Sequence, residues 1–201
     1  MKKFYDKSAA EAGIGVFLNA LGFDWQNDPH MKQTPKRFVK AWIEDFAKGS
    51  FEDTPEITAF PNDEKYDGMV CQTNINVTSL CQHHLAPFFG YCHVAYLPDP
   101  AGKVIGLSKL NRIVDHFSRR PQVQESLTQQ IHDFVNKVCE NNLGVAVMIE
   151  ANHTCCSMRG IKQNSTMRTA KMSGAFRDSV NNSRNEFYKF VEFAQNSRSL
   201  V

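Results

Sequence analysis

The chain has 201 residues, of which 42% are hydrophobic and 22% charged, and its formal net charge is +2 at pH 7. This composition is ordinary for a globular chain and excludes an intrinsically disordered one. The small charge does not favour nucleic-acid binding, and no stretch approaches the about 20 apolar residues of a membrane-spanning helix. Because the N-terminus shows no export signal, we expect a cytoplasmic protein, without nucleic-acid or membrane partners, whose six cysteines are thiols.

Residues 1–67 predict an N-terminal helical segment followed by a connector. Apolar residues recur at helical spacing over residues 9–47, which predicts two helices, the second with Thr34 as its N-cap and Pro35 as its first residue. Turn-forming residues over 48–67 predict the connector. The residues expected to face a core from these helices are Ile14, Phe17, Leu18, Leu21, Phe38, Trp42 and Phe46.

Residues 68–201 predict a single catalytic domain of class α+β. The first two strands are expected to form an antiparallel pair around a loop at 81–89, and two helices and two further extended segments follow. The expected elements are strands at 69–80 and 90–97, helices at 107–117 and from Pro121 to 138, a strand at 144–151, an extended segment at 163–174 and a helix at 183–196.

Two clusters of cysteine and histidine follow predicted strands. They are Cys-Gln-His-His at 81–84 and His-Thr-Cys-Cys at 153–156, and thiolate with imidazole suits zinc. The clusters are far apart in the sequence and lack the paired C-x-x-C pattern of a closed structural site. From the residues alone, a shared metal site and buried free cysteines beside hydrogen-bonded histidines both remain open. The isolated Cys71, Cys92 and Cys139 favour simple burial.

Four separated motifs resemble those of GTP cyclohydrolase I. They are Ser-Leu-Cys-Gln-His-His-Leu-Ala-Pro-Phe at 79–88, Val-Ile-Gly-Leu-Ser-Lys-Leu-Asn-Arg-Ile-Val at 104–114, Arg-Pro-Gln-Val-Gln-Glu at 120–125 and Glu-Ala-Asn-His-Thr-Cys at 150–155. The similarity extends to Thr-Pro-Lys-Arg at 34–37, to Met-Arg-Gly at 158–160 and to Met-Ser-Gly-Ala-Phe at 172–176, and so covers nearly the whole chain. The resemblance implies the tunnelling fold, an antiparallel sheet with two helices packed on one face. It also implies a toroidal homodecamer with active sites between subunits.

The resemblance implies a zinc (Zn2+) site on Cys81, His84 and Cys155. Three protein ligands leave a fourth position for water. It further implies proton transfer by His83 and His153 and a role for Ser108 near the ribose. Without the resemblance, a histidine beside a metal ligand favours another ligand or a supporting group, and a serine before a helix is as often an N-cap.

The implied substrate is GTP. Glu125 would accept hydrogen bonds from N1–H and the 2-amino group of guanine, and Gln124 would bind the remaining base edge. Read without the motif, Glu125 is a solvated acid in a helix's first turn, and the cations form an ordinary solvated surface. The residues expected to bind the triphosphate are Lys109, Arg112 and Arg159, with Arg37 and Lys40 from the N-terminal helices.

The implied reaction opens the imidazole ring of guanine by hydrolysis, releases formate and closes a new ring to give 7,8-dihydroneopterin triphosphate, the first step of a pterin, folate or 7-deazaguanine pathway. Gln82, where the family commonly has glutamate, and Cys156, beside the expected ligand Cys155, depart from the pattern. A GTP-binding paralogue without turnover and a structural module stapled by zinc are the alternatives. No motif favours the nitrile reductase that shares the fold.

Overall fold

The computed structural model describes residues 4–178 and 182–198. The chain divides into two compact units, Met1–Asp53 and Thr54–Val201. The short strand β1 (Ala59–Pro61) pairs with β4 (Lys103–Ile105), so part of the expected connector belongs to the second unit. The functional division that the sequence predicts at residue 67 stays a prediction.

The first unit is helical, as expected. It contains α1 (Lys7–Ala20), α2 (Thr34–Ala41), a π-helical turn (Trp42–Phe46) and a 3-10 turn (Lys48–Ser50). Asp6 caps α1 by accepting a hydrogen bond from the backbone N–H of Ala9. The prediction for Thr34 was wrong by one residue, because Gln33 is the N-cap of α2 and Thr34 lies inside the helix.

The expected core face of the first unit is largely exposed. Leu18 and Val39 are buried, but Phe17 and Leu21 are each 58% exposed. Two short helices enclose too little volume to bury apolar side chains on all their faces, which is why the periodic pattern overestimated the core. Phe38 and Phe46, also expected in the core, are 43% and 41% exposed.

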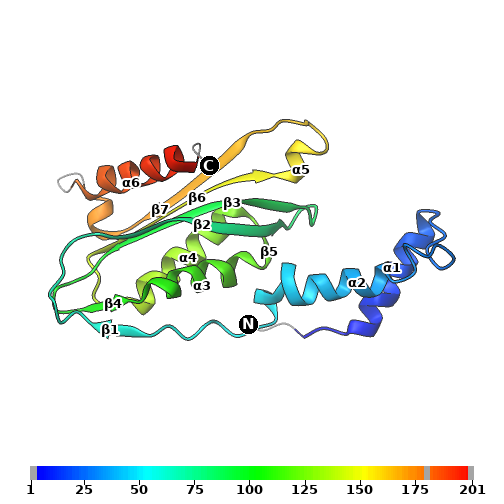
Figure 1. The fold of residues 1–201 in the computed structure, drawn as a ribbon, viewed down its shortest axis with the longest axis horizontal. Helices are drawn as coiled ribbons and strands as arrows, with labels where there is room; N and C mark the ends of the chain where they lie inside the picture. Colours follow the sequence, from blue (N-terminus) through cyan, green and yellow to red (C-terminus); the bar gives the residue numbers. More distant parts are fainter. Residues whose placement is uncertain (1–3, 179–181, 199–201) are drawn as a thin grey trace. The chain divides into compact units, whose positions relative to one another are not determined.

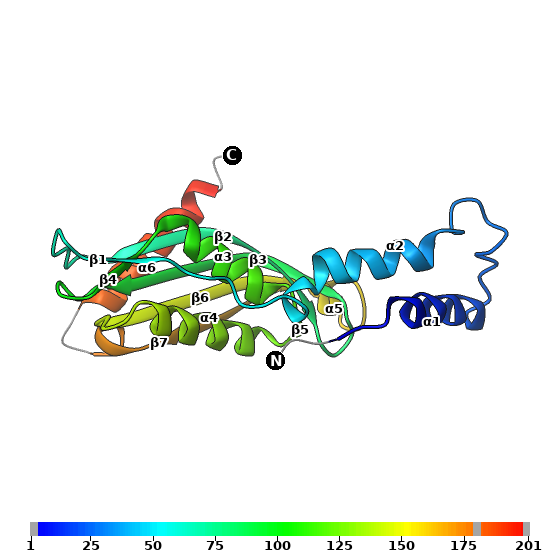
Figure 2. The same cartoon turned by 90° about the horizontal axis from the view of Figure 1, so that it is seen from below.

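The second unit is built on a five-stranded sheet of order β5-β2-β3-β6-β7. Neighbouring strands are antiparallel, except that β5 runs parallel to β2. Helices α3 (Leu107–Ser118) and α4 (Gln124–Val138) cover one face, and α6 (Ser183–Arg198) lies on the other (Figures 1 and 2). The strands are β2 (Val70–Cys81), β3 (Pro87–Leu97), β5 (Pro121–Gln122), β6 (Gly144–His153) and β7 (Thr166–Met172). The α+β arrangement with two helices on one face is therefore confirmed.

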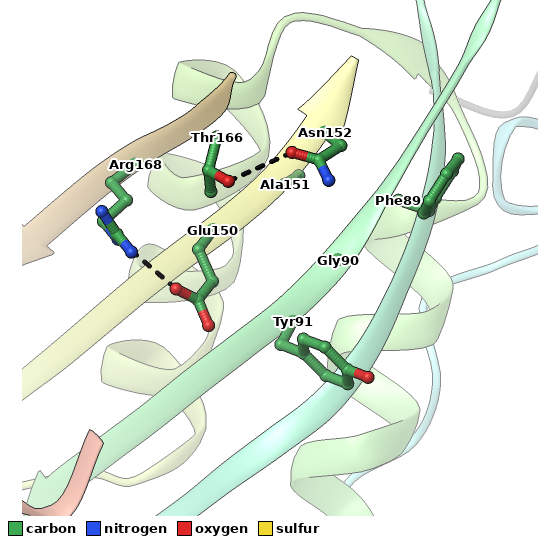
Figure 3. Close-up of a pocket in the computed structure, with 8 residues that line it drawn as sticks. All are labelled: Phe89, Gly90, Tyr91, Glu150, Ala151, Asn152, Thr166 and Arg168. Atoms are coloured by element: carbon green, nitrogen blue, oxygen red, sulfur yellow. Dashed lines mark hydrogen bonds and ion pairs between the residues drawn. The ribbon is translucent and has the colours of Figure 1, made fainter. Parts of the chain in front are cut away.

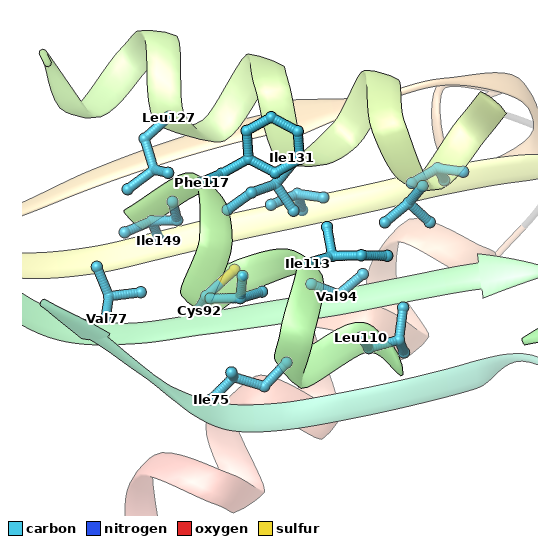
Figure 4. Packing of buried hydrophobic residues seen from close by; sticks show 14 of the residues in the cluster. Ile75, Val77, Cys92, Val94, Leu110, Ile113, Phe117, Leu127, Ile131 and Ile149 are labelled. Atoms are coloured by element: carbon cyan, nitrogen blue, oxygen red, sulfur yellow. The ribbon is translucent and has the colours of Figure 1, made fainter. Parts of the chain in front are cut away.

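The main core lies between the sheet and the helices α3 and α4. The apolar side chains of both helices, among them Ile113 and Ile131, point toward the strands and pack in one cluster with Val94 and Ile149 (Figure 4). Burial of one such side chain stabilises the fold by about 1.5–3 kcal/mol. The prediction that Cys92 and Cys139 pack as small hydrophobes is confirmed, because both lie in this core.

The segment that joins α3 to α4 differs from the prediction. Pro121 does not open a helix; it lies beside Leu80 in the short parallel strand β5, and α4 begins at Gln124. A proline lacks the N–H that a strand donates, so it is tolerated at the edge of the sheet, where β5 lies. This pairing ends at Cys81 and Gln122, which attaches the start of α4 to the end of β2.

Candidate metal centre and active site

Strand pairing brings the two cysteine–histidine clusters together. Both β2 and β6 pair with β3, in registers that include Leu80 with Pro87 and His153 with Phe88, so the two motifs lie at the same end of the sheet. After β6 the chain enters the one-turn helix α5 (Thr154–Ser157). The Thr154 hydroxyl donates to the carbonyl of Pro87 at 2.6 Å and ties this turn to β3.

Cys81, His84 and Cys155 form a group that can hold a metal ion. Their ligand atoms all lie within 4.8 Å of one another; Cys81 is buried and His84 is exposed. Two sulfurs and one imidazole are the donors that zinc prefers, and three donors leave a position open. The donor set therefore fits the ion that the sequence predicted, although the binding of zinc stays a prediction.

The thiols of this group are close enough to affect one another. Burial, together with the smaller effects of the neighbouring thiols of Cys81 and then Cys156, raises the pKa of the Cys155 thiol to about 11. A nearby cation would favour the thiolates instead. Cys156 is exposed and lies outside the three-residue group, as does the exposed Gln82, so neither departure from the family pattern removes a donor.

Two further predicted residues contact the group. The Nδ1 atom of His83 lies 3.8 Å from the sulfur of Cys81. On the other side, Nη1 of Arg159 lies 2.9 Å from Nε2 of His84. The structure therefore brings a predicted proton-transfer residue and a predicted phosphate-binding residue to the same group of donors.

His153 is held at the end of β6 by two neighbours. Its ring stacks on that of the buried Phe88, with centroids 4.4 Å apart and planes 9° from parallel. Its Nε2 atom lies 2.9 Å from Oε1 of Gln124. Burial lowers the pKa of His153, and the negative charge of Glu125 opposes that shift. The imidazole is thus oriented and favoured in its neutral form.

The side chain of Gln124, predicted to bind guanine, is buried and hydrogen-bonded within the protein. Gln124 is only 1% exposed, and both ends of the amide bind protein groups. The contact between this side chain and the base edge stays a prediction, and these hydrogen bonds would have to rearrange for it to form. Periodicity and motif could not reveal the burial and hydrogen bonding of this amide, because its partners come from strands β6 and β7.

Glu125 is exposed in the first turn of α4 and lines a cavity of about 270 Å³ against β7. Lys171 of β7 lines the same cavity, a residue that no sequence motif singled out. The remaining lining residues are Thr128, Gln129, Thr169 and Ala170. A carboxylate on the wall of a polar cavity can accept two hydrogen bonds from one ligand edge.

The other predicted site residues lie on helices. Ser108, Lys109 and Arg112 are on α3, whose N-cap is Gly106, so Ser108 is not the cap that the alternative interpretation required. Within residues 4–178 and 182–198, no hydrogen bond or ion pair joins these three to the Cys-His-Cys group. Arg37 and Lys40 lie on α2 in the first unit, where Lys40 pairs with Glu44 at 3.7 Å.

Another cavity, of about 340 Å³, opens on the face of the sheet that carries α6 (Figure 3). Its floor is the buried carboxylate of Glu150, which accepts hydrogen bonds from Nε of Arg168 at 3.4 Å and from Nε2 of Gln195 at 2.7 Å. Tyr91 and Phe89 of β3 form its opposite side. None of the predicted site residues lines it.

A Cys-His-Cys group that could hold a metal ion, at the end of an antiparallel sheet with two helices on one face, defines an α+β protein with a candidate metal site. The model of the family described as GTP cyclohydrolase I matches residues 10–192. The chain belongs to the GTP cyclohydrolase I family, and the expected tunnelling fold of that family is confirmed.

Curated relatives agree with this assignment. GTP cyclohydrolase 1 of Coxiella burnetii (strain RSA 493 / Nine Mile phase I) is 46% identical over 180 residues, which cover 89% of this chain and 95% of the relative. A protein of Pseudomonas syringae pv. tomato named GTP cyclohydrolase 1 1 is 50% identical over 162 residues, which cover 79% of this chain and 83% of that relative. A solved structure described as archaeosine synthase QueF-Like in the apo form has a TM-score of 0.43 at 19% identity and covers 54% of this chain and 96% of that one.

Every helix in the part of the chain that the structure describes is too short or too polar to cross a bilayer.

Proposed function

We propose that this chain is a GTP cyclohydrolase I, which opens the imidazole ring of the guanine of GTP, releases formate and forms 7,8-dihydroneopterin triphosphate. The observation that carries the proposal is the meeting of Cys81, His84 and Cys155, from two distant motifs, within 4.8 Å. Membership of the family supplies the reaction. The product would enter a pterin, folate or 7-deazaguanine pathway in the cytoplasm.

Zinc is the cofactor that the site favours. Cys81 and Cys155 would hold it through their sulfurs and His84 through one ring nitrogen. When bound by three protein donors, zinc keeps a position for water and brings the pKa of that water close to neutrality. A purely structural site would use a fourth protein donor, and the group found among the described residues has three.

The histidines beside the metal position would move the protons of the reaction. Ring opening and formate release each require a proton to be taken from water and another to be given to the nitrogen whose bond to carbon breaks. His83, 3.8 Å from the sulfur of Cys81, and His153, two residues before Cys155 and with its ring stacked on Phe88, would carry out these transfers. A neutral imidazole can accept a proton at working pH and then return it.

The substrate would be oriented by a carboxylate at one end and cations at the other. Glu125, on the wall of its cavity, would accept hydrogen bonds from N1–H and the 2-amino group of guanine. Ser108 would act near the ribose. The triphosphate would bind Arg159, Lys109 and Arg112, with Arg37 and Lys40 as further cations.

We propose the family's toroidal homodecamer as the working assembly. The exposure of Phe17, Leu21 and Phe23 on the first unit supports it, because adjoining apolar side chains on a helical unit favour a protein interface. In this assembly, neighbouring subunits would complete each active site. Measuring the mass of the protein in solution by light scattering tests the proposal.

The test of the activity is incubation of the zinc-loaded protein with GTP, while formate release and the fluorescence of the oxidised pterin are followed. A second sample is stripped with EDTA, and a third is stripped and reloaded with zinc. Metal-dependent appearance of both products supports the proposal. Tight GTP binding without either product would favour the paralogue without turnover, and zinc retention with neither binding nor turnover would favour the structural module.

A further inference from the structure

The side-chain amide of Gln124 has only one possible orientation. Its Nε2 group lies 3.1 Å from the carbonyl oxygen of Ile149 and 3.2 Å from that of Met167. Carbonyl oxygens only accept hydrogen bonds, so the NH2 group must face them. Turning the amide over would set its oxygen against two carbonyl oxygens, neither of which can donate to it.

A third contact agrees with this orientation. Nε2 of Gln124 also lies 3.1 Å from the hydroxyl oxygen of Thr169. The hydroxyl of Thr128 donates to the backbone carbonyl of Gln124 at 2.9 Å, so the close pair of threonine oxygens, 2.6 Å apart, requires Thr169 to donate to Thr128. Thr169 therefore has lone pairs left to accept from Gln124.

The orientation of the amide determines which nitrogen of His153 carries a proton. Oε1 of Gln124 faces Nε2 of His153 at 2.9 Å, and an amide oxygen can only accept. Nε2 must therefore donate. In a neutral imidazole with a proton on Nε2, the lone pair is on Nδ1. Within the described residues, Nδ1 of His153 makes no hydrogen bond.

We propose that Gln124 is a positioning residue that holds the proton on Nε2 of His153 and leaves Nδ1 as the atom that exchanges protons with water and substrate. This inference rests on the proposed function. Nδ1 takes a proton from the attacking water, the resulting imidazolium keeps its Nε2–H bond to Gln124, and the same proton then passes from Nδ1 to a leaving nitrogen. The proton is returned within the cycle, so no other reactant is needed.

Phe88 makes this arrangement rigid. Its ring, fully buried on β3, lies almost parallel to that of His153. The stacking prevents the imidazole from tilting, and the hydrogen bond that Nε2 of His153 donates to Gln124 prevents the ring from turning over. Together they direct one edge of His153 to the protein and leave the other edge, with Nδ1, for the reaction.

Solid-state nitrogen NMR of the zinc-loaded full chain, with 15N in the histidine rings, tests the inference. Protonated and bare ring nitrogens resonate far apart, and the spectrum of His153→Asn identifies His153 among the seven histidines. We expect a protonated Nε2 and a bare Nδ1. The control Thr169→Val removes one partner of the NH2 group but keeps Oε1 in place, so this state should persist. A proton on Nδ1 in the unmodified protein would overturn the inference.

Kinetics of two variants give a second readout. Gln124→Met keeps the volume but removes the acceptor; we expect mixed protonation of His153 and a kcat lower by about 10- to 100-fold, with the zinc content and the KM for GTP unchanged. Gln124→Glu, protonated in this buried position, can still donate to Ile149 and accept from His153, and should recover part of the loss. A higher KM with unchanged kcat and unchanged protonation of His153 would contradict the positioning role and would favour binding of the guanine base by Gln124.

The outcomes stay separable if a variant fails to fold or the activity is absent. A Gln124→Met protein that loses zinc is set aside, and the spectra of the unmodified protein and of Thr169→Val then decide. An unmodified protein that releases no formate defeats the proposed function, whereas the protonation state of His153 is measured without turnover.

Discussion

Arg159 donates a hydrogen bond from Nη1 to Nε2 of His84, across a distance of 2.9 Å. Arg159, which is expected to bind phosphate, thus makes a hydrogen bond to the ring of His84, which is expected to bind zinc. A lone pair that accepts this hydrogen bond is not available to a metal at the same time. Zinc and triphosphate binding should therefore be coupled, because a phosphate that attracts Arg159 releases His84.

We expect Arg159→Leu to bind zinc about two- to tenfold more tightly than the unmodified chain in the absence of nucleotide, because one competing hydrogen bond is lost. The same variant should bind GTP more weakly. Competition with a chromophoric chelator measures the first effect and calorimetry the second. Lys137→Leu, which removes an exposed cation from α4, is the control. Weaker zinc binding by Arg159→Leu would contradict the coupling.

Substitution of a metal ligand and substitution of a proton-transfer residue should have different effects on zinc content and turnover. Cys155→Ala should lose zinc and formate release together, because a sulfur donor is removed. His153→Asn should keep zinc and lose turnover by about 100-fold or more, the usual contribution of a general acid or base. Metal analysis of each purified protein and the formate assay provide the comparison. Cys156→Ala, beside the ligand but exposed, should keep both properties. Equal zinc loss in the Cys155 and His153 variants would refute this division of roles.

Glu125→Gln should weaken GTP binding with little effect on zinc. The amide offers one acceptor and one donor where the carboxylate offers two acceptors, so one of the two hydrogen bonds to guanine is lost. Hydrogen bonds to charged groups contribute about 1.5–3 kcal/mol, so we expect the Kd for GTP to rise by about 10- to 100-fold. Calorimetry with a GTP analogue whose guanine ring is not opened measures this Kd. Glu140→Gln, an exposed acid after α4, is the control, and unchanged affinity in Glu125→Gln would exclude Glu125 from the site.

Gly90→Ala should destabilise the fold near the site. An added Cβ would lie 1.9 Å from the carbonyl oxygen of Glu150, a backbone atom of the paired strand. Strands β3 and β6 would have to separate, which would disturb the stacking of Phe88 on His153, and overpacking of this kind costs about 1–3 kcal/mol. Urea unfolding measures the free energy.

Gly13→Ala is the matched control for Gly90→Ala. It lies in α1 with nothing within 4 Å of the added Cβ. Alanine favours a helix over glycine by about 1 kcal/mol, so this variant should be equally stable or more stable. Equal stability of both alanine variants would show that the backbone at Gly90 can relax and would contradict the clash.

Local patterns were sufficient for most of the elements. Val77 and Ile75 on β2, and Ile113 with Val114 on α3, lie in the core that their periodicity predicted. The motif positions were also informative about the candidate metal group, since Cys81 at the end of β2 and Cys155 in α5 lie close together with His84. Periodicity failed where neighbours decide burial, as at Phe17, because it cannot tell a core from an exposed apolar surface.

The sequence by itself determined the α+β class and the order of the main strands and helices, because spacing and side-chain chemistry are local properties. The candidate metal ligands Cys81, His84 and Cys155 came from the family resemblance of their motifs. Only the tertiary structure decided that Pro121 forms a strand beside β2, that Arg159 reaches His84 and that Gln124 binds His153. Each of these depends on hydrogen-bond partners from distant segments. The orientation of Gln124 follows from two carbonyl groups on β6 and β7, whose positions are defined by the pairing of strands and not by the residues around position 124.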